Sequence, residues 1–273
     1  ESRDGTVGGF WLTNSTFYNN TALVGSGPVD IFIKNVNATI ANCNFTLNVA
    51  RGGDGGALKI RTSLDSIPGT GFFDVHDCVY AQNIAQTGGA ITLDDCFVHF
   101  LRCQFVNNLV NFTGGGIYAR INEIISFVDI DQCVFDGNTA PISGAGSSTT
   151  IDSDMNQQPI PARVVIRNNT YINNLVTDGS QGAFGAALTH YSGADNVQII
   201  GNSFINNTGV GGSGIAINSR FRENFVVQDN VFEGNVDTSP LGYTNYRMEL
   251  YQVTVDLIIL NNSWAPGTGI VSL

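Results

Sequence analysis

The sequence is poor in charge, and above all in positive charge. Lysine and arginine together number 12 against 23 acidic residues, which gives the 273-residue chain a formal net charge of −11 at pH 7. A chain of this sign is repelled by phosphate backbones and anionic lipid headgroups, so we expect no nucleic-acid partner. No stretch is apolar enough to cross a bilayer as a helix, so we also expect no membrane span in this chain.

Other absences narrow the chemistry. There are three histidines and five cysteines, and the cysteine spacing matches no zinc signature. The glycine-rich stretch 51–56 lacks the Gly-Lys-Ser/Thr ending of a phosphate-binding loop, and we expect no cofactor. The chain has no initiator methionine, signal peptide or basic targeting segment. We therefore expect a processed piece of a larger protein.

No unit carries an apolar i, i+3, i+4, i+7 stripe long enough for a packed helix. The chain instead repeats an eleven-residue frame nine times, as in Val98 to Asn108. Within the frame, apolar and polar residues alternate with the period of a β-strand. The first apolar column is Phe10, Ala38, Phe73, Val98, Val128, Val164, Val197, Phe225 and Leu257, and the second is Leu12, Ile40, Val75, Phe100, Ile130, Ile166, Ile199, Val227 and Ile259.

The frame predicts two internal ladders. Its aromatic position, from Phe17 to Trp264, recurs at spacings of 28, 35, 25, 30, 36, 33, 28 and 32 residues. Units that repeat in this way stack on one another to bury their apolar faces, so the aromatic rings should contact each other along the axis. The closing asparagine occurs eight times, from Asn20 to Asn235. Asparagine tolerates left-handed backbone at a turn and can bond its amide to the asparagines above and below.

Glycine pairs follow many of the frames. They read Gly55-Gly56-Ala57-Leu58, Gly88-Gly89-Ala90-Ile91 and Gly115-Gly116-Ile117-Tyr118, and glycine there permits the turn into the next strand. An aromatic-x-x-Asn element followed by Gly-Gly-Ala-Ile or Gly-Gly-Ala-Leu resembles the repeat of the chlamydial polymorphic outer membrane proteins and related pectin-lyase-like β-helix surface proteins. The resemblance covers nearly the whole chain. It implies right-handed β-helices that work in adhesion, with no catalytic residues.

Pattern and resemblance together give one fold. Neighbouring turns of a parallel β-helix lie about 4.8 Å apart, as adjacent parallel strands do. We therefore predict an all-β chain, a single-stranded right-handed parallel β-helix (solenoid) of about nine turns. The repeats run unbroken from Phe10 to Trp264, so residues 1–273 should form one domain, part of a larger protein.

Longer insertions interrupt the repeats at 62–71, 139–161, 177–185 and 236–247. In a solenoid, insertions emerge as loops and tend to form the binding side. The stretch from Ser143 to Pro161 is rich in serine, threonine and aspartate, and we predict that it is the most mobile loop.

Cys43, Cys78, Cys103 and Cys133 occupy one frame position in four consecutive turns. At this separation, disulfides Cys43–Cys78 and Cys103–Cys133 are geometrically possible. The alternative, which we favour, is a stack of buried thiols that behave as small apolar side chains, because in-register side chains point the same way. Cys96 is left over in either arrangement.

One outward column contains Asp74, His99 and Asp129 in consecutive turns, and Asp131 lies two places further on. If the chain is an enzyme, Asp74, His99 and Asp129 are its catalytic candidates; if it binds a metal ion, Asp131 joins them. The alternative is a solvated, salt-bridged ladder with His99 held as a cation between two aspartates. We favour the ladder, because the row should lie on an exposed face without a wall. We therefore expect no catalysis and no metal.

A second outward face follows the glycine pairs. Its columns contain Arg61, Asp94, Tyr118, Arg120 and Tyr191, which suit an extended glycan or a protein edge. The alternative is ordinary exposed strand chemistry. His190 should point inward, as a core histidine rather than a ligand.

Eight Asn-x-Ser/Thr sequons would carry glycans where exposed in a eukaryotic secretory pathway: Asn14, Asn19, Asn37, Asn44, Asn111, Asn168, Asn206 and Asn261. A bacterial origin would leave these sites bare. We expect an extracellular or cell-surface module with a structural or adhesive, non-enzymatic role. Its partner would be a surface protein or glycan, or another copy through uncapped solenoid ends. The alternative is a polysaccharide-active lyase, hydrolase or epimerase, since fold alone does not decide function.

Overall fold

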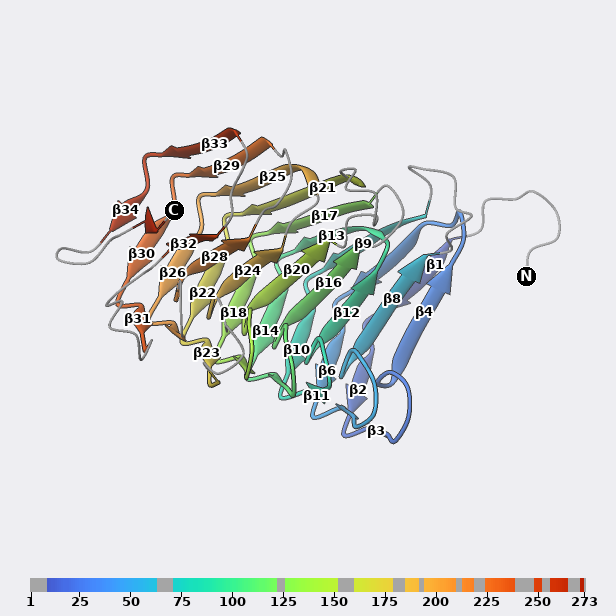
Figure 1. Cartoon of the computed structure of the whole chain (residues 1–273). Coiled ribbons are helices and arrows are strands. Elements are labelled where there is room, and N and C mark those ends of the chain that lie inside the picture. The colour runs from blue at the N-terminus through green and yellow to red at the C-terminus, as the bar shows by residue number, and fades with distance from the viewer. Residues whose placement is uncertain are drawn as a thin grey trace.

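The computed structural model describes residues 9–62, 71–121, 126–151, 160–178, 185–191, 194–209, 213–218, 224–238, 248–251, 256–264 and 271–272. These residues form strands and turns, and none of them belongs to a helix that could cross a membrane. The strands build four parallel sheets, here named A to D, that wind into a right-handed β-helix (Figure 1). The predicted all-β parallel solenoid is confirmed.

Sheets A and B each contain nine strands in chain order. The strands of sheet A are β1 (Phe10–Thr13), β5 (Ala38–Ala41), β9 (Phe72–His76), β13 (Phe97–Leu101), β17 (Ser126–Asp131), β21 (Ile160–Arg167), β25 (Ala194–Ile200), β29 (Asn224–Gln228) and β33 (Asp256–Leu260). Those of sheet B are β2 (Thr16–Tyr18), β6 (Asn44–Thr46), β10 (Val79–Ala81), β14 (Gln104–Val106), β18 (Val134–Asp136), β22 (Thr170–Ile172), β26 (Ser203–Ile205), β30 (Val231–Glu233) and β34 (Ser263–Trp264).

Sheet C is narrow and sheet D closes the coil. The strands of sheet C are β3 (Thr21–Ala22), β7 (Val49–Ala50), β11 (Ile84–Ala85), β15 (Leu109–Val110), β19 (Thr139–Ala140), β23 (Leu175–Val176), β27 (Thr208–Gly209) and β31 (Val236–Asp237). Those of sheet D are β4 (Val29–Ile33), β8 (Leu58–Thr62), β12 (Ile91–Asp94), β16 (Ile117–Ile121), β20 (Ser147–Ile151), β24 (Leu188–Tyr191), β28 (Ile215–Asn218), β32 (Met248–Tyr251) and β35 (Val271–Ser272).

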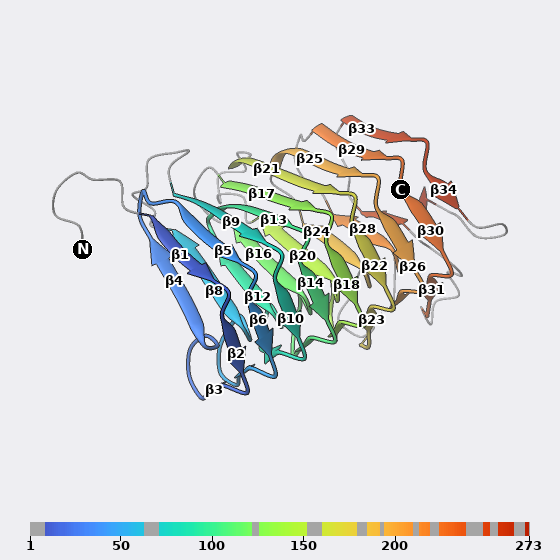
Figure 2. The same ribbon diagram turned by 180° about the vertical axis from the view of Figure 1, so that it is seen from behind.

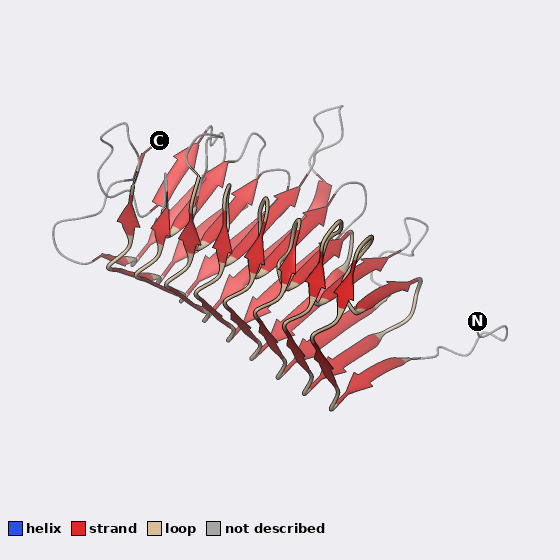
Figure 3. Ribbon diagram, turned by 90° about the horizontal axis from the view of Figure 1, so that it is seen from below, coloured by secondary structure: helices blue, strands red, loops and turns tan. Residues whose placement is uncertain are grey.

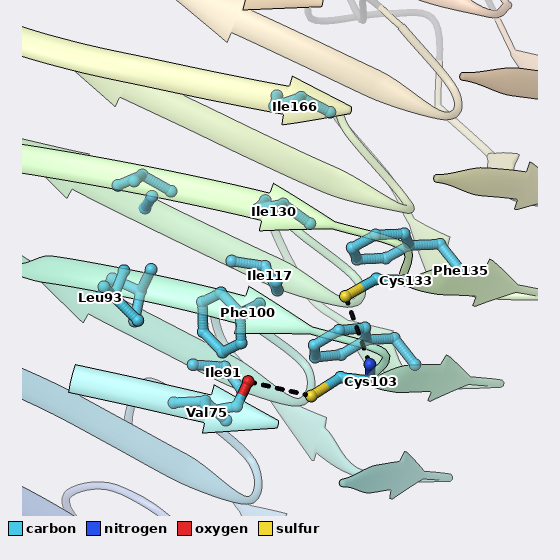
Figure 4. Close-up of a cluster of buried hydrophobic side chains, with 14 of the residues drawn as sticks. Val75, Ile91, Leu93, Phe100, Cys103, Ile117, Ile130, Cys133, Phe135 and Ile166 are labelled. Atoms are coloured by element: carbon cyan, nitrogen blue, oxygen red, sulfur yellow. Dashed lines mark hydrogen bonds between the residues drawn. The ribbon is translucent and has the colours of Figure 1, made fainter. Parts of the chain in front are cut away.

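Each coil visits sheets A, B, C and D in turn, and the next coil stacks beside it (Figures 2 and 3). The register is the one that the frame predicts: Phe10 pairs with Ala38, and Val98 pairs with both Phe73 and Val128. Alternate residues of the described strands of sheets A, B and D point into one main core, and the inward residues Val110, Ala140 and Val176 of sheet C form a second cluster with Ala145 and Ala186. Figure 4 shows its middle, where Val75, Phe100 and Ile130 lie on consecutive coils.

The aromatic column forms a continuous ladder inside the coil. Consecutive rings from Phe17 to Trp264 lie nearly parallel, with centroids 4.3 to 5.1 Å apart. This separation follows the strand spacing, so the stack is a consequence of in-register repeats. The rings of Tyr80, Phe105 and Phe135 are completely buried.

The closing asparagines form a second ladder at the corner between sheets B and C. From Asn20 to Asn207, each backbone N–H and side-chain Nδ2 donates to Oδ1 of the next asparagine at 2.8 to 3.2 Å. From Asn48 to Asn235, Nδ2 also donates to the carbonyl of the ladder aromatic one coil before, at 2.8 to 3.0 Å. The ladder therefore satisfies its own buried polar groups.

The expected left-handed backbone lies one residue before the ladder, not on it. Asn107, with φ of 53°, precedes Asn108, and Leu47, with φ of 59°, precedes Asn48. The corner between sheets A and B has the same geometry, as at Arg102 before Cys103. The left-handed residue turns the chain outward, so its side chain is exposed while the ladder residue that follows is buried.

The four column cysteines and Asn169, Asn202, Asn230 and Asn262 form a third ladder at the corner between sheets A and B. The N–H of Cys103 donates to Sγ of Cys133, and the Cys103 thiol donates to the carbonyl of Val75 (Figure 4). The N–H of Cys133 donates to Oδ1 of Asn169. From Asn169 onward the ladder consists of hydrogen bonds between asparagine side chains and the next coil. A thiol thus takes the place of an amide in the same ladder. All five cysteines are buried free thiols, the arrangement that we favoured over disulfides.

The glycine pairs solve two steric problems. Gly88 has φ of 57°, and a Cβ there would lie 2.3 Å from Oγ1 of Thr92. A Cβ on Gly89 would lie 2.3 Å from the carbonyl oxygen of Gly115, on the next coil. Strand register places Gly114 and Gly115 as the third pair, one residue before the pair read from the sequence, because Ile91 pairs with Ile117.

The predicted mobile loop is partly wrong. Ser147–Ile151 forms β20 of sheet D and pairs with both β16 and β24. Serine and threonine stand there where other coils carry apolar residues, so composition suggested a loop while the register of the neighbouring coils imposed a strand. Residues 152–159 lie outside the described residues, as do 63–70, 179–184 and 239–247 of the other insertions.

Candidate functional site

The predicted row lies on the outward face of sheet A, at the middle of the rod. His99 pairs with Asp74 on one side and Asp129 on the other. Its Nδ1 is 3.3 Å from Oδ1 of Asp74, whereas its Nε2 is 4.0 Å from Oδ2 of Asp129. The second distance is beyond a hydrogen bond. The row is therefore a His–Asp pair with a second aspartate beside it, and not the symmetrical triplet that the spacing suggested.

Asp129 is also not the exposed group that we expected. Its side chain is 10% exposed, against 44% for Asp74. Burial raises the pKa of Asp129 above its ordinary value, and the nearby Arg167 and His99 only partly offset this. The expectation of a uniformly solvated row is wrong because the neighbouring coil supplies a wall, the side chain of Arg167.

Arg167 was missed from the sequence and organises this half of the face. Its Nη2 is 2.9 Å from Oδ2 of Asp129 and its Nε is 3.2 Å from Oδ2 of Asp131. The frame could have revealed it, because Arg167 occupies the position of Asp131 one coil further on. A guanidinium between two carboxylates takes the place that a cation would occupy. Among the described residues, no group of three or more acidic, histidine or cysteine side chains could hold a metal ion.

Neither oxygen of Asp129 is both exposed and free of a partner. Oδ2 is bound by Arg167, and Oδ1 is buried with no hydrogen-bond partner among the described residues. A general acid or base must reach the reacting proton within hydrogen-bond distance. The burial that raises the pKa of Asp129 thus also keeps its carboxylate from reaching a substrate proton.

Beside the Asp74 end of the row, at the corner between sheets A and B, lies an ordinary ion-pair cluster. Arg102 donates from Nε and Nη2 to the two oxygens of Asp77 at 2.7 and 2.8 Å, and Nδ1 of His76 is 2.9 Å from Asp77. These hydrogen bonds, Arg102 first, hold the pKa of the Asp77 carboxyl far below its usual range. This part of the face fits the salt-bridged ladder.

The opposite signs of these two pKa shifts give a prediction for stability. Asp129 has a raised folded-state pKa, so its contribution to stability is present at acid pH and is lost as pH rises through that pKa. Asp129→Asn should therefore melt at a higher temperature than the wild type at pH 7, with the gap closing as the pH is lowered. Calorimetric scans at several pH values measure this.

Asp77→Asn is the matched control with the opposite sign. The pKa of Asp77 is lowered, so its contribution is present at neutral pH and disappears as pH falls. Asparagine fits the left-handed backbone at this position, φ 55°, so the substitution removes the charge and one acceptor of the Arg102 hydrogen bonds without straining the backbone. A lower melting temperature of Asp129→Asn than of the wild type at pH 7 would show that Arg167 outweighs burial.

The second predicted face is assembled as the columns require. Arg61, Asp94 and Arg120 are neighbours across β8, β12 and β16. Arg120 Nη2 is 2.8 Å from Asp94, and Arg61 binds Asp30 at 2.9 Å, with its guanidinium 5.5 Å from the ring centroid of Phe32. Both arginine side chains remain 40% exposed.

A lysine and a loop aspartate extend this cluster. Lys59 lies 3.0 Å from Asp54 and 3.3 Å from Asp94. Burial alone would raise the pKa of Asp54, but the Thr87 hydroxyl and Lys59 hold it below its usual value. Tyr118 stands beside the arginines and Tyr191 two strands further along, both half-buried. The five predicted residues therefore share one face.

This face is less open than the alternation implied. Thr92, Ser148 and Thr189 belong to an outward column of sheet D, yet each is only 1% exposed. The left-handed glycines of the preceding turns lie against them: a Cβ on Gly144 would be 2.7 Å from Cβ of Ser148. The more accessible column of the face is the second, which carries the arginines.

His190 lies in the core, as predicted. It is completely buried, and its ring meets that of Phe225 edge-on, with centroids 5.5 Å apart. The buried thiols are equally unsuited to chemistry, because burial raises the pKa of Cys96 and Cys103 and keeps them protonated.

Comparison with family models, curated proteins and solved structures finds no match to this chain. The resemblance to chlamydial repeats stays an expectation from short motifs. Function is therefore inferred from the geometry of the two charged faces.

Proposed function

We propose that this chain is an extracellular or cell-surface β-helix module, an exported glycoprotein with a structural or adhesive role. It binds a surface protein or glycan and catalyses no reaction. The observation that carries the proposal is the arginine cluster of sheet D, Arg61 and Arg120 on either side of Asp94. Two half-exposed guanidiniums held by ion pairs on a rigid sheet offer donors in fixed positions to carboxylates, hydroxyls or backbone carbonyls.

The fold supports recognition rather than chemistry at this face. The ladders inside the coil fix the backbone on which the arginines stand, so little order has to be gained on binding. The arginines are already neutralised by Asp30 and Asp94, so a neutral ligand suits the face better than a strongly charged one. A neutral glycan chain or the polar edge of a protein fits this description.

The double variant Arg61→Ser, Arg120→Ser tests this function. The purified chain is passed over immobilised neutral and uronic-acid polysaccharides and over fixed cells. Because each arginine donates charge-assisted hydrogen bonds, we expect retention to fall by about tenfold or more. Arg102→Ser removes one arginine at the edge of sheet A and should change little. Equal retention of wild type and double variant would refute this binding face.

The alternative function is a polysaccharide-active enzyme with Asp74, His99 and Asp129 as its catalytic residues. The raised pKa of Asp129 favours it, because a general acid needs such a shift. Against it stand the bound and buried oxygens of Asp129 and the 4.0 Å separation from His99. We therefore place recognition first.

A further inference from the structure

Charge is distributed unequally around the solenoid. The ion pairs described above lie on or beside sheets A and D. Among the outward positions of the described strands of sheets B and C, Asp136 and Glu233 are the charged ones. Aliphatic side chains there are exposed by 37 to 47%: Ile84, Leu109, Val134, Leu175, Val231 and Val236. Exposed apolar side chains in adjacent positions, as at Ile84 and Leu109, mark a surface that another group can contact.

The sequon asparagines gather on the same side. All eight are exposed. Asn14, Asn168 and Asn261 stand at the corner between sheets A and B, and Asn19 and Asn206 at the corner between B and C. Asn44 lies on sheet B and Asn111 directly follows sheet C, whereas Asn37 precedes sheet A. Seven of the eight therefore border the charge-poor side.

Backbone geometry explains the corner asparagines but not their sequons. Within the described residues, the two corners contain 17 left-handed residues, of which eight are asparagine, as that conformation favours. A serine or threonine stands two places after five of these eight asparagines, but after two of the other nine residues. The position two places on is an outward strand position, where valine, leucine and isoleucine also occur. A serine or threonine at this strand position is therefore associated with asparagine at the corner, and the strand position alone does not require it.

We propose that N-linked glycans on the seven sequons that border sheets B and C cover the outward faces of these two sheets and leave the charged faces of sheets A and D open. This inference rests on the extracellular setting of the proposed function, reached through a eukaryotic secretory pathway. Glycans are bulky and solubilising, so a row at each corner would shield the aliphatic side chains between them. The solenoid would have one coated side and one side open for recognition.

The hydroxyl position allows a matched test of the modification. Thr208 and Thr139 are both half-buried outward residues of sheet C, and Val49 and Val236 occupy the same column. Thr208 completes the sequon of Asn206, whereas Gly137 stands two places before Thr139. In the chain secreted from a eukaryotic cell, Thr208→Val should lose the mass of one glycan, and Thr139→Val should lose none. Unmodified corner asparagines would overturn the proposal.

A second measurement tests the covering role. After an endoglycosidase has trimmed the folded protein, sedimentation should show association, while the glycosylated chain stays monomeric. The variant Ile84→Thr, Val134→Thr, Val236→Thr, which creates no new sequon, should abolish that association, because threonine already occupies the same columns at Thr139, Thr170 and Thr208. A trimmed chain that stays monomeric, or association that survives the triple variant, would overturn the proposal. Neither the glycan mass nor the association state depends on ligand binding, so a failure of this proposal can be told apart from a failure of the recognition function.

Discussion

Phe105→Ala should lower the free energy of unfolding by about 3 to 5 kcal/mol, which corresponds to roughly 10 °C in melting temperature. The Phe105 ring is completely buried and stacks on Tyr80 and Phe135 at 5.1 and 4.7 Å, with Phe100 edge-on at 6.1 Å. Alanine leaves a cavity in mid-ladder that the flanking coils cannot close, because their own hydrogen bonds fix their spacing. Thermal and urea unfolding measure the loss.

Phe112→Ala is the control for this prediction. The Phe112 side chain is 49% exposed, outside the ladder. Its removal should change stability by less than about 0.5 kcal/mol. If the two variants melted at the same temperature, the aromatic ladder would not be a major source of stability.

Asn108→Ala should cost about 1 to 3 kcal/mol, although it removes no apolar group. Asn108 Oδ1 accepts from the N–H and Nδ2 of Asn83 at 3.0 Å, and its own Nδ2 donates to Asn138 and to the Tyr80 carbonyl. The substitution leaves these buried groups on both neighbouring coils without their partner. Because Asn108 itself is completely buried, water cannot replace the lost bonds without opening the corner.

Asn111→Ala provides the comparison at an exposed position three residues later. It should leave the unfolding midpoint unchanged within about 0.5 kcal/mol. Serine at position 108 would restore a small part of the loss, since a hydroxyl can bond only one coil. If Asn108→Ala were as stable as Asn111→Ala, the hydrogen bonds of the asparagine ladder would contribute nothing to the free energy of unfolding.

The sequence contains most of the fold because each residue is repeated in a fixed frame. The alternation around Val98 and Phe100 defines the inward face, and the recurrence of Phe105 and Asn108 defines the register. In a solenoid the neighbours of a residue are the same frame positions one coil away, so a one-dimensional pattern fixes three-dimensional contacts. For this reason the spacing of Asp74, His99 and Asp129 along the chain is enough to place them in one row.

The repeat frame does not predict the conformations of long side chains or the backbone path of the turns. Asp129 is buried because Arg167 bends back across the face, a contact set by side-chain conformation rather than by register. Thr92 is covered because Gly88 folds over it, which depends on a left-handed turn outside the frame. β20 was missed because its strand is imposed by the coils on either side.

The most direct test of recognition without catalysis is to follow ligand retention and polymer length in one incubation. Neutral and uronic-acid polysaccharides are incubated with the chain, with and without calcium, and the polymer size distribution is measured beside the bound fraction. We predict retention that depends on Arg61 and Arg120, with polymer length unchanged. Shortened polymer in the wild type, and intact polymer with folded Asp129→Asn, would contradict the account and make the row on sheet A an active site.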